Sequence, residues 1–303
     1  MAIEANWKPL STYFEYICSF HHLDMNLRTN SARQEYHDTW MRKYHALVGT
    51  WNDYETAIWS VRARQSLKLC FSATNFALES KKAEKEGVMA AAYYLGYYSA
   101  LHAMWSVIYL NPQQTTKNVY DISHSKMLNV FYSTYAHSHN SIIHADAKKK
   151  VENLRFLREY YSYRMPLNSP FENDEELKSS ITSLGGFVKQ CIQLANLHSH
   201  LLTKVAWKQT KSSSRIPYNL SSKFKDEYCS INGKQHISKK DIILEPADKA
   251  ALSEYLKLGC DIMPLNFAFD HMFDEYMTYY SNDRPEYDVI AKTRNLVGRA
   301  FIK

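Results

Sequence analysis

The chain has 303 residues, of which 45% are apolar and 22% are charged, a balance typical of a globular protein and unlike that of a disordered one. It contains only 8 glycines and 8 prolines, which favours long helices with few breaks. The formal net charge of +6 is too small to identify a partner, and the five widely spaced cysteines have no metal-ligand spacing.

A membrane location is not favoured. The first residues, MAIEANWKPL, lack the basic start and apolar run of a signal peptide. Residues 88–110 carry no charge and are long enough to cross a bilayer, but five tyrosines and a histidine among them favour a buried core helix. We therefore expect a cytoplasmic protein with reduced thiols and no membrane partner.

The sequence of residues 1–110 predicts an N-terminal helical extension followed by two long helices. Residues 1–52 are expected to form an N-terminal helical extension. Apolar spacing predicts a long helix over 53–80, a charged break over 81–87 and a second helix over 88–110. Asn111-Pro112 should end that second helix, because proline cannot continue the hydrogen-bond ladder.

The next helices have recognisable start signals. Ser123 is a plausible N-cap for a helix that runs through Tyr135. Asp146 could cap a helix over 147–163, which Met165-Pro166 would stop. A further helix is predicted over 174–207, so that 53–207 would form one helical domain.

Residues 208–303 are expected to form a C-terminal α+β extension. Residues 208–225 contain a run of serines and resemble a linker or loop. Asn232-Gly233 suits the tight turn of a small β-hairpin over 228–238, and 242–244 could add a strand. Helices are predicted from Pro246 to Cys260, over 265–280 and over 285–302.

Basic residues cluster in two stretches. No aspartate or glutamate occurs between Leu177 and Lys225, and residues 148–164 are also rich in lysine and arginine. Such clusters are typical of nucleic-acid contacts, although an ordinary solvated surface is the alternative. The residues predicted to make these contacts are Lys148, Lys149, Arg155, Arg164, Lys208 and Lys211.

Two histidines are further candidates for nucleic-acid contacts. His102 shares one face of the 88–110 helix with Tyr94, Tyr98 and Trp105, because these residues are spaced by three or four. His124 follows Ser123 at a predicted helix start, where backbone N–H groups favour an anion. Ordinary packing and capping are the alternatives for both.

The order of these motifs resembles the HEPN superfamily. The segment YYLGYYSALHA, which ends in His102-Ala103, is followed by Ser123-His124 and then by Leu157-Arg158 with Tyr163 downstream. The resemblance covers residues from about 55 to 165. It implies an antiparallel helical bundle, so the expected fold is mainly α: a HEPN-like bundle with a C-terminal helical extension that contains a small β-hairpin.

The same resemblance implies metal-independent RNA cleavage at an Arg-centred site built across a homodimer. Arg158 would hold the scissile phosphate, since its planar guanidinium matches phosphate oxygens. Active HEPN ribonucleases commonly place a histidine after this arginine, where the chain has Tyr163, and tyrosine is a weaker general base. His139 and His144 are spaced similarly, and two imidazoles could act as acid and base, although a polar loop is the alternative.

No motif predicts a cofactor or a metal. Phosphate loops of the types GxxxxGK[ST] and GxGxxG are absent, as are GxSxG and HExxH. Two functional hypotheses remain, beside a third in which the protein is an all-helical scaffold whose tyrosines serve only as core. The protein is a HEPN-like endoribonuclease of a prokaryotic defence or toxin–antitoxin system, with an antitoxin or defence-complex partner, or it is a non-catalytic module that binds nucleic acid, a nucleotide or a protein.

Overall fold

The computed structural model describes residues 20–210, except 24–25, 52, 121, 138–140, 165, 167, 169 and 172, together with 262–269, 272 and 286–302. These residues are mainly helical, which confirms the expected fold class at that level, and no strand occurs among them. The hairpin, the strand and the helix predicted between Tyr228 and Cys260 lie outside the described residues.

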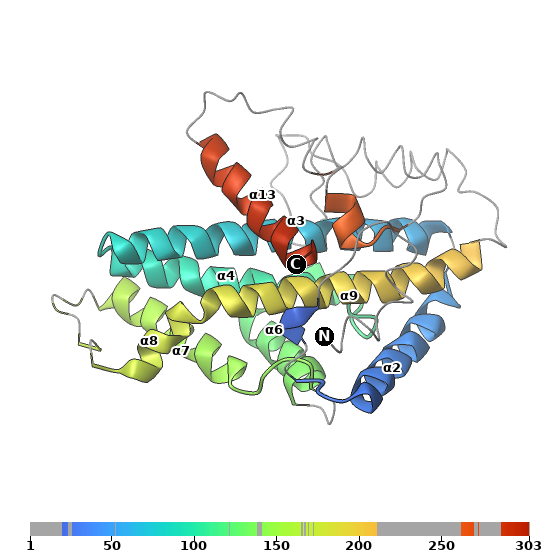
Figure 1. Ribbon diagram of the computed structural model, residues 1–303, viewed down its shortest axis with the longest axis horizontal. Coiled ribbons are helices and arrows are strands. Elements are labelled where there is room, and N and C mark those ends of the chain that lie inside the picture. Colours follow the sequence, from blue (N-terminus) through green and yellow to red (C-terminus); the bar gives the residue numbers. More distant parts are fainter. Residues whose placement is uncertain are drawn as a thin grey trace.

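Two long antiparallel helices form the centre of the fold (Figure 1). They are α3 (Asp53–Lys85) and α4 (Met89–Tyr109). The break predicted over 81–87 is wrong in its position, because lysine, alanine and glutamate continue a helix readily and α3 extends to Lys85. Gly87 then makes the turn with a φ of 76°, a backbone conformation that glycine adopts without a steric penalty.

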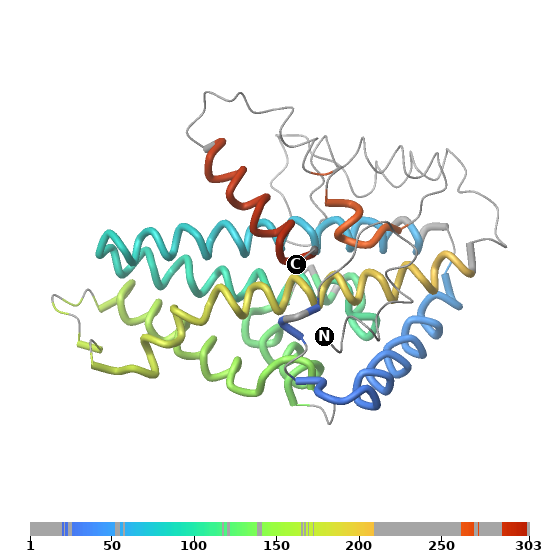
Figure 2. The backbone as a smooth tube through the Cα atoms, in the orientation of Figure 1, coloured from blue at the N-terminus to red at the C-terminus, as the bar shows by residue number. Residues whose placement is uncertain are grey.

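The helix α9 (Leu184–Thr210) lies along this pair and is the most enclosed helix of the described structure. Every residue from Cys191 to Thr203 is buried. The helices α2 (Asn30–Val48) and α13 (Glu286–Ile302) pack on α9, and the tube in Figure 2 shows them on opposite sides of it. A helix that is covered on all sides must find partners for its polar residues inside the protein.

The helix predicted over 174–207 is broken in the structure. The first part is α8 (Glu175–Thr182), in which Asp174 caps the start by accepting a hydrogen bond from Leu177 N at 3.0 Å. The chain turns at Ser183 before α9 begins, and Gly185-Gly186 directly after the turn are poor helix formers. The apolar spacing of 174–207 continues on both sides of Ser183, and for this reason the sequence pattern did not predict the break.

The segment before α8 carries the remaining helices. The short helices η1 (His21–Leu23) and α5 (Thr116–Tyr120) flank the bundle. Ser123 is the N-cap of α6 (His124–Phe131), as predicted, and it accepts a hydrogen bond from Lys126 N. The helix predicted through Tyr135 ends earlier, because the chain widens into the π-helical turn η2 (Tyr132–Ala136).

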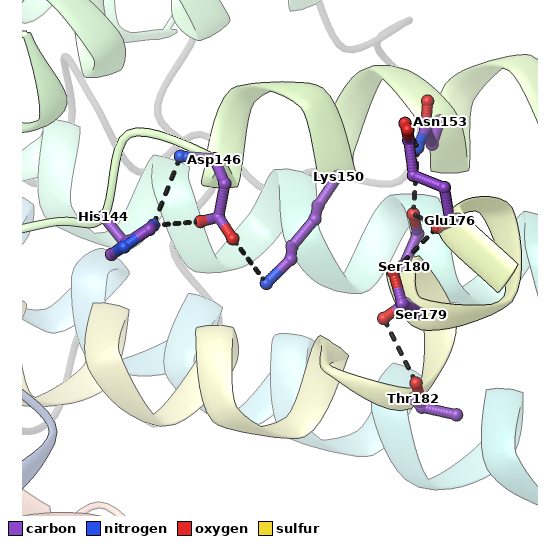
Figure 3. A network of polar contacts seen from close by, with 8 residues as sticks. All are labelled: His144, Asp146, Lys150, Asn153, Glu176, Ser179, Ser180 and Thr182. Atoms are coloured by element: carbon purple, nitrogen blue, oxygen red, sulfur yellow. Dashed lines mark hydrogen bonds and ion pairs between the residues drawn. The ribbon is translucent and has the colours of Figure 1, made fainter.

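Helix α7 (Ala147–Tyr163) has the predicted bounds and packs on α4 and α8. The predicted cap is wrong, because the Asp146 side chain accepts no hydrogen bond from the first turn. Its carboxylate binds His144 and Lys150 instead, at 2.6 Å and 2.9 Å (Figure 3).

The described parts of the C-terminal region pack on both α3 and α9, and their polar contacts with α9 are well defined. Leu265 N and Asn266 N donate to the side chains of Ser199 and Asn196, at 3.0 Å and 3.1 Å. His200 Nε2 lies 2.8 Å from Asn266 Oδ1. The polar residues of the enclosed helix therefore bind the backbone of a segment that follows it by more than 50 positions.

Candidate functional site

Three aromatic side chains of α4, those of Tyr94, Tyr97 and Tyr98, form the floor of the candidate site. Tyr94 and Tyr98 have ring centroids 4.8 Å apart, and Tyr97 and Tyr98 have centroids 5.4 Å apart. Tyr97 is buried, whereas Tyr94 is 48% exposed. Because these tyrosines are three or four residues apart, they lie on one face of α4. That face extends from the buried Tyr97 to the exposed Tyr94.

His124 stands beside this floor at the start of α6. Its Nδ1 lies 3.2 Å from the Tyr97 hydroxyl, and its ring meets that of Tyr98 edge-on at 5.9 Å. Partial burial lowers the pKa of His124, and the positive charges of Arg158 and Arg155 lower it further. The imidazole is therefore neutral at pH 7 while it remains exposed to solvent.

Helix α7 brings two arginines to the same place. The Arg158 guanidinium carbon lies 5.1 Å from the centroid of the Tyr97 ring, a cation–π distance. The Arg158 side chain is only 16% exposed, and its Nε is buried without a hydrogen-bond partner among the described residues. Arg155 Nε binds Glu159 Oε1 at 2.9 Å, and Arg158 reaches the same oxygen at 3.4 Å.

His102 forms the inner wall. Its Nδ1 lies 2.8 Å from Ser72 Oγ on α3, and its ring lies 5.2 Å from that of Phe76. Burial, together with a smaller effect of the nearby His124, lowers the pKa of His102 to about 4. His102 is therefore a neutral group with a fixed orientation, directly behind His124.

Tyr163 lies on the same surface at the end of α7. Tyr163 is 73% exposed. The pKa of the Tyr94 hydroxyl is raised mainly by Tyr98, and Tyr163 is close enough to add a smaller effect in the same direction. Tyr163 thus faces solvent at the outer edge of the aromatic floor. The structure brings together five residues that the sequence singled out, namely Arg155, Arg158, Tyr163, His102 and His124.

The other predicted residues lie elsewhere. His144 pairs with Asp146 at the N-terminal end of α7 (Figure 3). The first residue of that helix lies about 17 Å along the axis from Arg158. Lys149 binds Glu176 of α8 at 2.7 Å, and Lys148 lies 3.8 Å from Glu152. Arg164 is exposed just after α7, Lys208 is exposed near the end of α9, and both His139 and Lys211 lie outside the described residues.

Sequence reasoning missed Ser72 and Glu159. Ser72 precedes His102 by 30 positions, and only the pairing of α3 with α4 brings them together. Glu159 could have been found, because an acid four residues after Arg155 on a helix is a standard ion-pair spacing. Its effect is to place one carboxylate beside both arginines, which leaves a local excess of one positive charge.

Comparisons of the chain with protein-family models, with curated proteins and with solved structures found no match. Among the described residues, no group of three or more histidine, cysteine, aspartate or glutamate side chains is arranged to hold a metal ion. None of the described helices is long and apolar enough to span a membrane.

Proposed function

We propose that the protein binds RNA through the surface formed by Tyr94, Tyr98, His124, Arg155 and Arg158, and that it cleaves RNA there without a metal ion. The observation that carries this proposal is the position of Arg158 beside a neutral, exposed His124 over the Tyr97 ring. A cation next to a neutral imidazole supplies two of the groups that phosphodiester transesterification uses, namely charge stabilisation and a general base.

The chemistry assigns one role to each group. His124 removes the proton from a ribose 2′-hydroxyl, which attacks the adjacent phosphorus and displaces the 5′ oxygen of the next nucleotide. Arg158 and Arg155 offset the negative charge that develops on the phosphate oxygens. Tyr163 donates a proton to the leaving oxygen and recovers one from solvent. The products are a 2′,3′-cyclic phosphate and a 5′-hydroxyl.

This scheme requires one tautomer of His124. The Nδ1–H must donate to the Tyr97 hydroxyl oxygen, so that the lone pair of Nε2 is available as the base. Tyr97 is then a positioning residue. Replacing it by phenylalanine should lower kcat more than it changes KM.

The resemblance to HEPN proteins supports the assignment of Arg158, and it implies a homodimer in which two such sites face each other. Tyr163 of α7 is 73% exposed and Tyr94 is 48% exposed, and together they give this surface an aromatic character that a second copy could cover. Sedimentation of the purified protein tests this part of the proposal.

A non-catalytic RNA-binding module is the second proposal. The observation that favours it is the ion pairing of both arginines with Glu159, which reduces the charge available to a phosphate. Arg158 and the tyrosines would still hold a nucleotide, while Tyr163 in place of a histidine would leave cleavage without its usual base.

One experiment distinguishes the two proposals. Labelled RNA is incubated in EDTA with the wild type, Arg158→Ala and His124→Gln, and binding of the same RNA is measured in parallel. The matched control is Lys126→Ala, which removes an exposed charge from the same helix as His124. For catalysis, we expect His124→Gln to lose about 100-fold or more in cleavage while it retains binding.

The outcomes are distinct. Cleavage by the wild type that Arg158→Ala and His124→Gln abolish supports the ribonuclease, and unchanged cleavage in either variant contradicts the assigned roles. Binding without cleavage, weakened by Arg158→Ala and by salt, supports the binding module. An absence of both binding and cleavage would reject both proposals.

A further inference from the structure

A second site lies on the other side of α3, and it does not depend on the proposed function. A cavity of about 390 Å³, partly open to solvent, is lined by α3, the end of α8, the first half of α9 and Leu296 of α13. Ser72 faces His102, whereas Thr74, two residues later, lines this cavity, so the two sites lie about 200° apart around α3.

The size of the cavity is a reason to expect a ligand. Small-molecule sites are concave and commonly occupy about 300–1,000 Å³, a range that includes this cavity. The inner walls are mostly aliphatic, from Leu78, Ile181, Val188, Ile192 and Leu296. A partly enclosed aliphatic space of this kind suits an apolar body.

The polar groups inside the cavity are already engaged. Ser80 Oγ donates to Ala92 O at 2.7 Å, and Thr74 Oγ1 donates to Cys70 O at 2.8 Å. Thr182 Oγ1 likewise donates to carbonyls of its own helix. Because these hydroxyl protons point at backbone carbonyls, the inner wall offers no hydroxyl proton to a charged ligand group.

The charges of the cavity come from three residues. Lys81 on α3 and Lys189 on α9 line it together with Glu84, which gives a local excess of one positive charge. Lys81 is exposed and Lys189 is half-buried, and neither forms an ion pair with a described residue. Cations at the entrance of an aliphatic space complement a ligand with one negative group and an apolar tail.

We propose that this cavity binds a small amphipathic anion, whose carboxylate or phosphate head pairs with Lys81 and Lys189 while its aliphatic body fills the space between α3, α9 and α13. The ligand would bridge a helix of the central pair and the C-terminal helix. Its binding should therefore also raise the unfolding temperature.

The test uses the whole 303-residue chain and three probes with eight-carbon chains, namely octanoate, octyl phosphate and the neutral 1-octanol, with octylammonium as a cationic control and titration calorimetry as the readout. We expect both anions to bind more tightly than octanol, and the tighter of the two identifies the head group. The double variant Lys81→Ala/Lys189→Ala should weaken anion binding roughly tenfold and remove its salt dependence. Ala77→Leu, which fills the cavity, should weaken all three probes.

The matched control is Lys82→Ala, an exposed lysine of α3 that does not line the cavity, and it should bind octanoate as the wild type does. Thermal unfolding of each variant confirms that it is folded. The proposal is overturned if the anions do not bind, if octylammonium binds as tightly as octanoate, or if the lysine and Ala77 variants leave anion binding unchanged. RNA binding and cleavage should be unaffected by Lys81→Ala/Lys189→Ala, which separates this proposal from the proposed function.

Discussion

A single buried charge, that of Arg62, stabilises one end of the central helix pair. Arg62 of α3 is 1% exposed, and its guanidinium donates to three backbone carbonyls, those of Tyr109, Asn111 and Gln114, at distances between 2.7 Å and 3.2 Å. The guanidinium carbon also lies 3.7 Å from the centroid of the Trp59 ring. The last carbonyls of a helix have no partners within it, and here one side chain satisfies them where water cannot reach.

Replacing Arg62 by methionine should therefore lower the free energy of unfolding by about 3 kcal/mol, because buried carbonyls would lose their donors. Urea denaturation measures the change. Lys82→Met on the exposed face of the same helix is the control, with an expected change within about 0.5 kcal/mol. An Arg62→Met protein as stable as this control would show that the three hydrogen bonds contribute nothing net.

At the scale of elements, the close crossing of α4 with its neighbours depends on Gly96. A Cβ atom at Gly96 would lie 3.1 Å from Ser80 Oγ and 3.6 Å from side-chain carbons of Leu154 and Leu184. These three residues belong to α3, α7 and α9. The absence of a side chain at this one position therefore lets three helices approach α4.

Gly96→Leu should destabilise the protein by about 3 kcal/mol or more, because a branched side chain cannot be accommodated without moving one of these helices. Differential scanning calorimetry measures the effect. Gly185→Ala is the matched control, since nothing lies within 4 Å of a Cβ at that position, and its expected effect is slightly stabilising. Equal melting temperatures for Gly96→Leu and the wild type would contradict the packing argument.

At the scale of the whole molecule, buried histidines connect the elements. His198 on α9 binds two tyrosines of α2, with Tyr36 Oη 3.0 Å from Nε2 and Tyr44 Oη 2.9 Å from Nδ1. Tyr44 also donates to Leu110 O, so it accepts from Nδ1–H, and Tyr36 donates to Nε2. This network requires a neutral imidazole, and burial lowers the pKa of His198 to about 3.

Stability should therefore fall as the pH drops below about 6.5. Unfolded histidines bind protons there, whereas folded His198, with a pKa of about 3, and His200, with a pKa of about 4, do not. Each contributes a slope of up to about 1.4 kcal/mol per pH unit, and this contribution is fully present only above the unfolded pKa. The measurement is urea unfolding at several pH values between 7 and 4.5.

The control for this prediction is His198→Gln, which removes one titrating group. Its overall stability will be lower, but its slope with pH should be shallower than that of the wild type by the contribution of one proton. An unchanged slope in the variant would mean that His198 does not couple folding to protonation.

Local patterns were sufficient for much of the fold. The bounds of α7 and α13 follow from their apolar spacing and from the prolines beside them, and Ser123 is identified as a cap by its own residue type. The break between α8 and α9 was missed because the apolar residues of 174–207 continue on both sides of Ser183. The carboxylate of Asp146 was misassigned because its oxygens contact the side chains of His144 and Lys150 and not the N–H groups of the first turn.

The sequence by itself determined which residues can do chemistry, since arginine, histidine and tyrosine occur at spacings that place them on single helix faces. Only the tertiary structure decided which of these faces meet. It places Arg158 over Tyr97 and beside His124, and it leaves His144 at the opposite end of α7. The physical reason is that contacts between helices depend on packing over long sequence separations, such as that between Ser72 and His102, for which no local pattern exists.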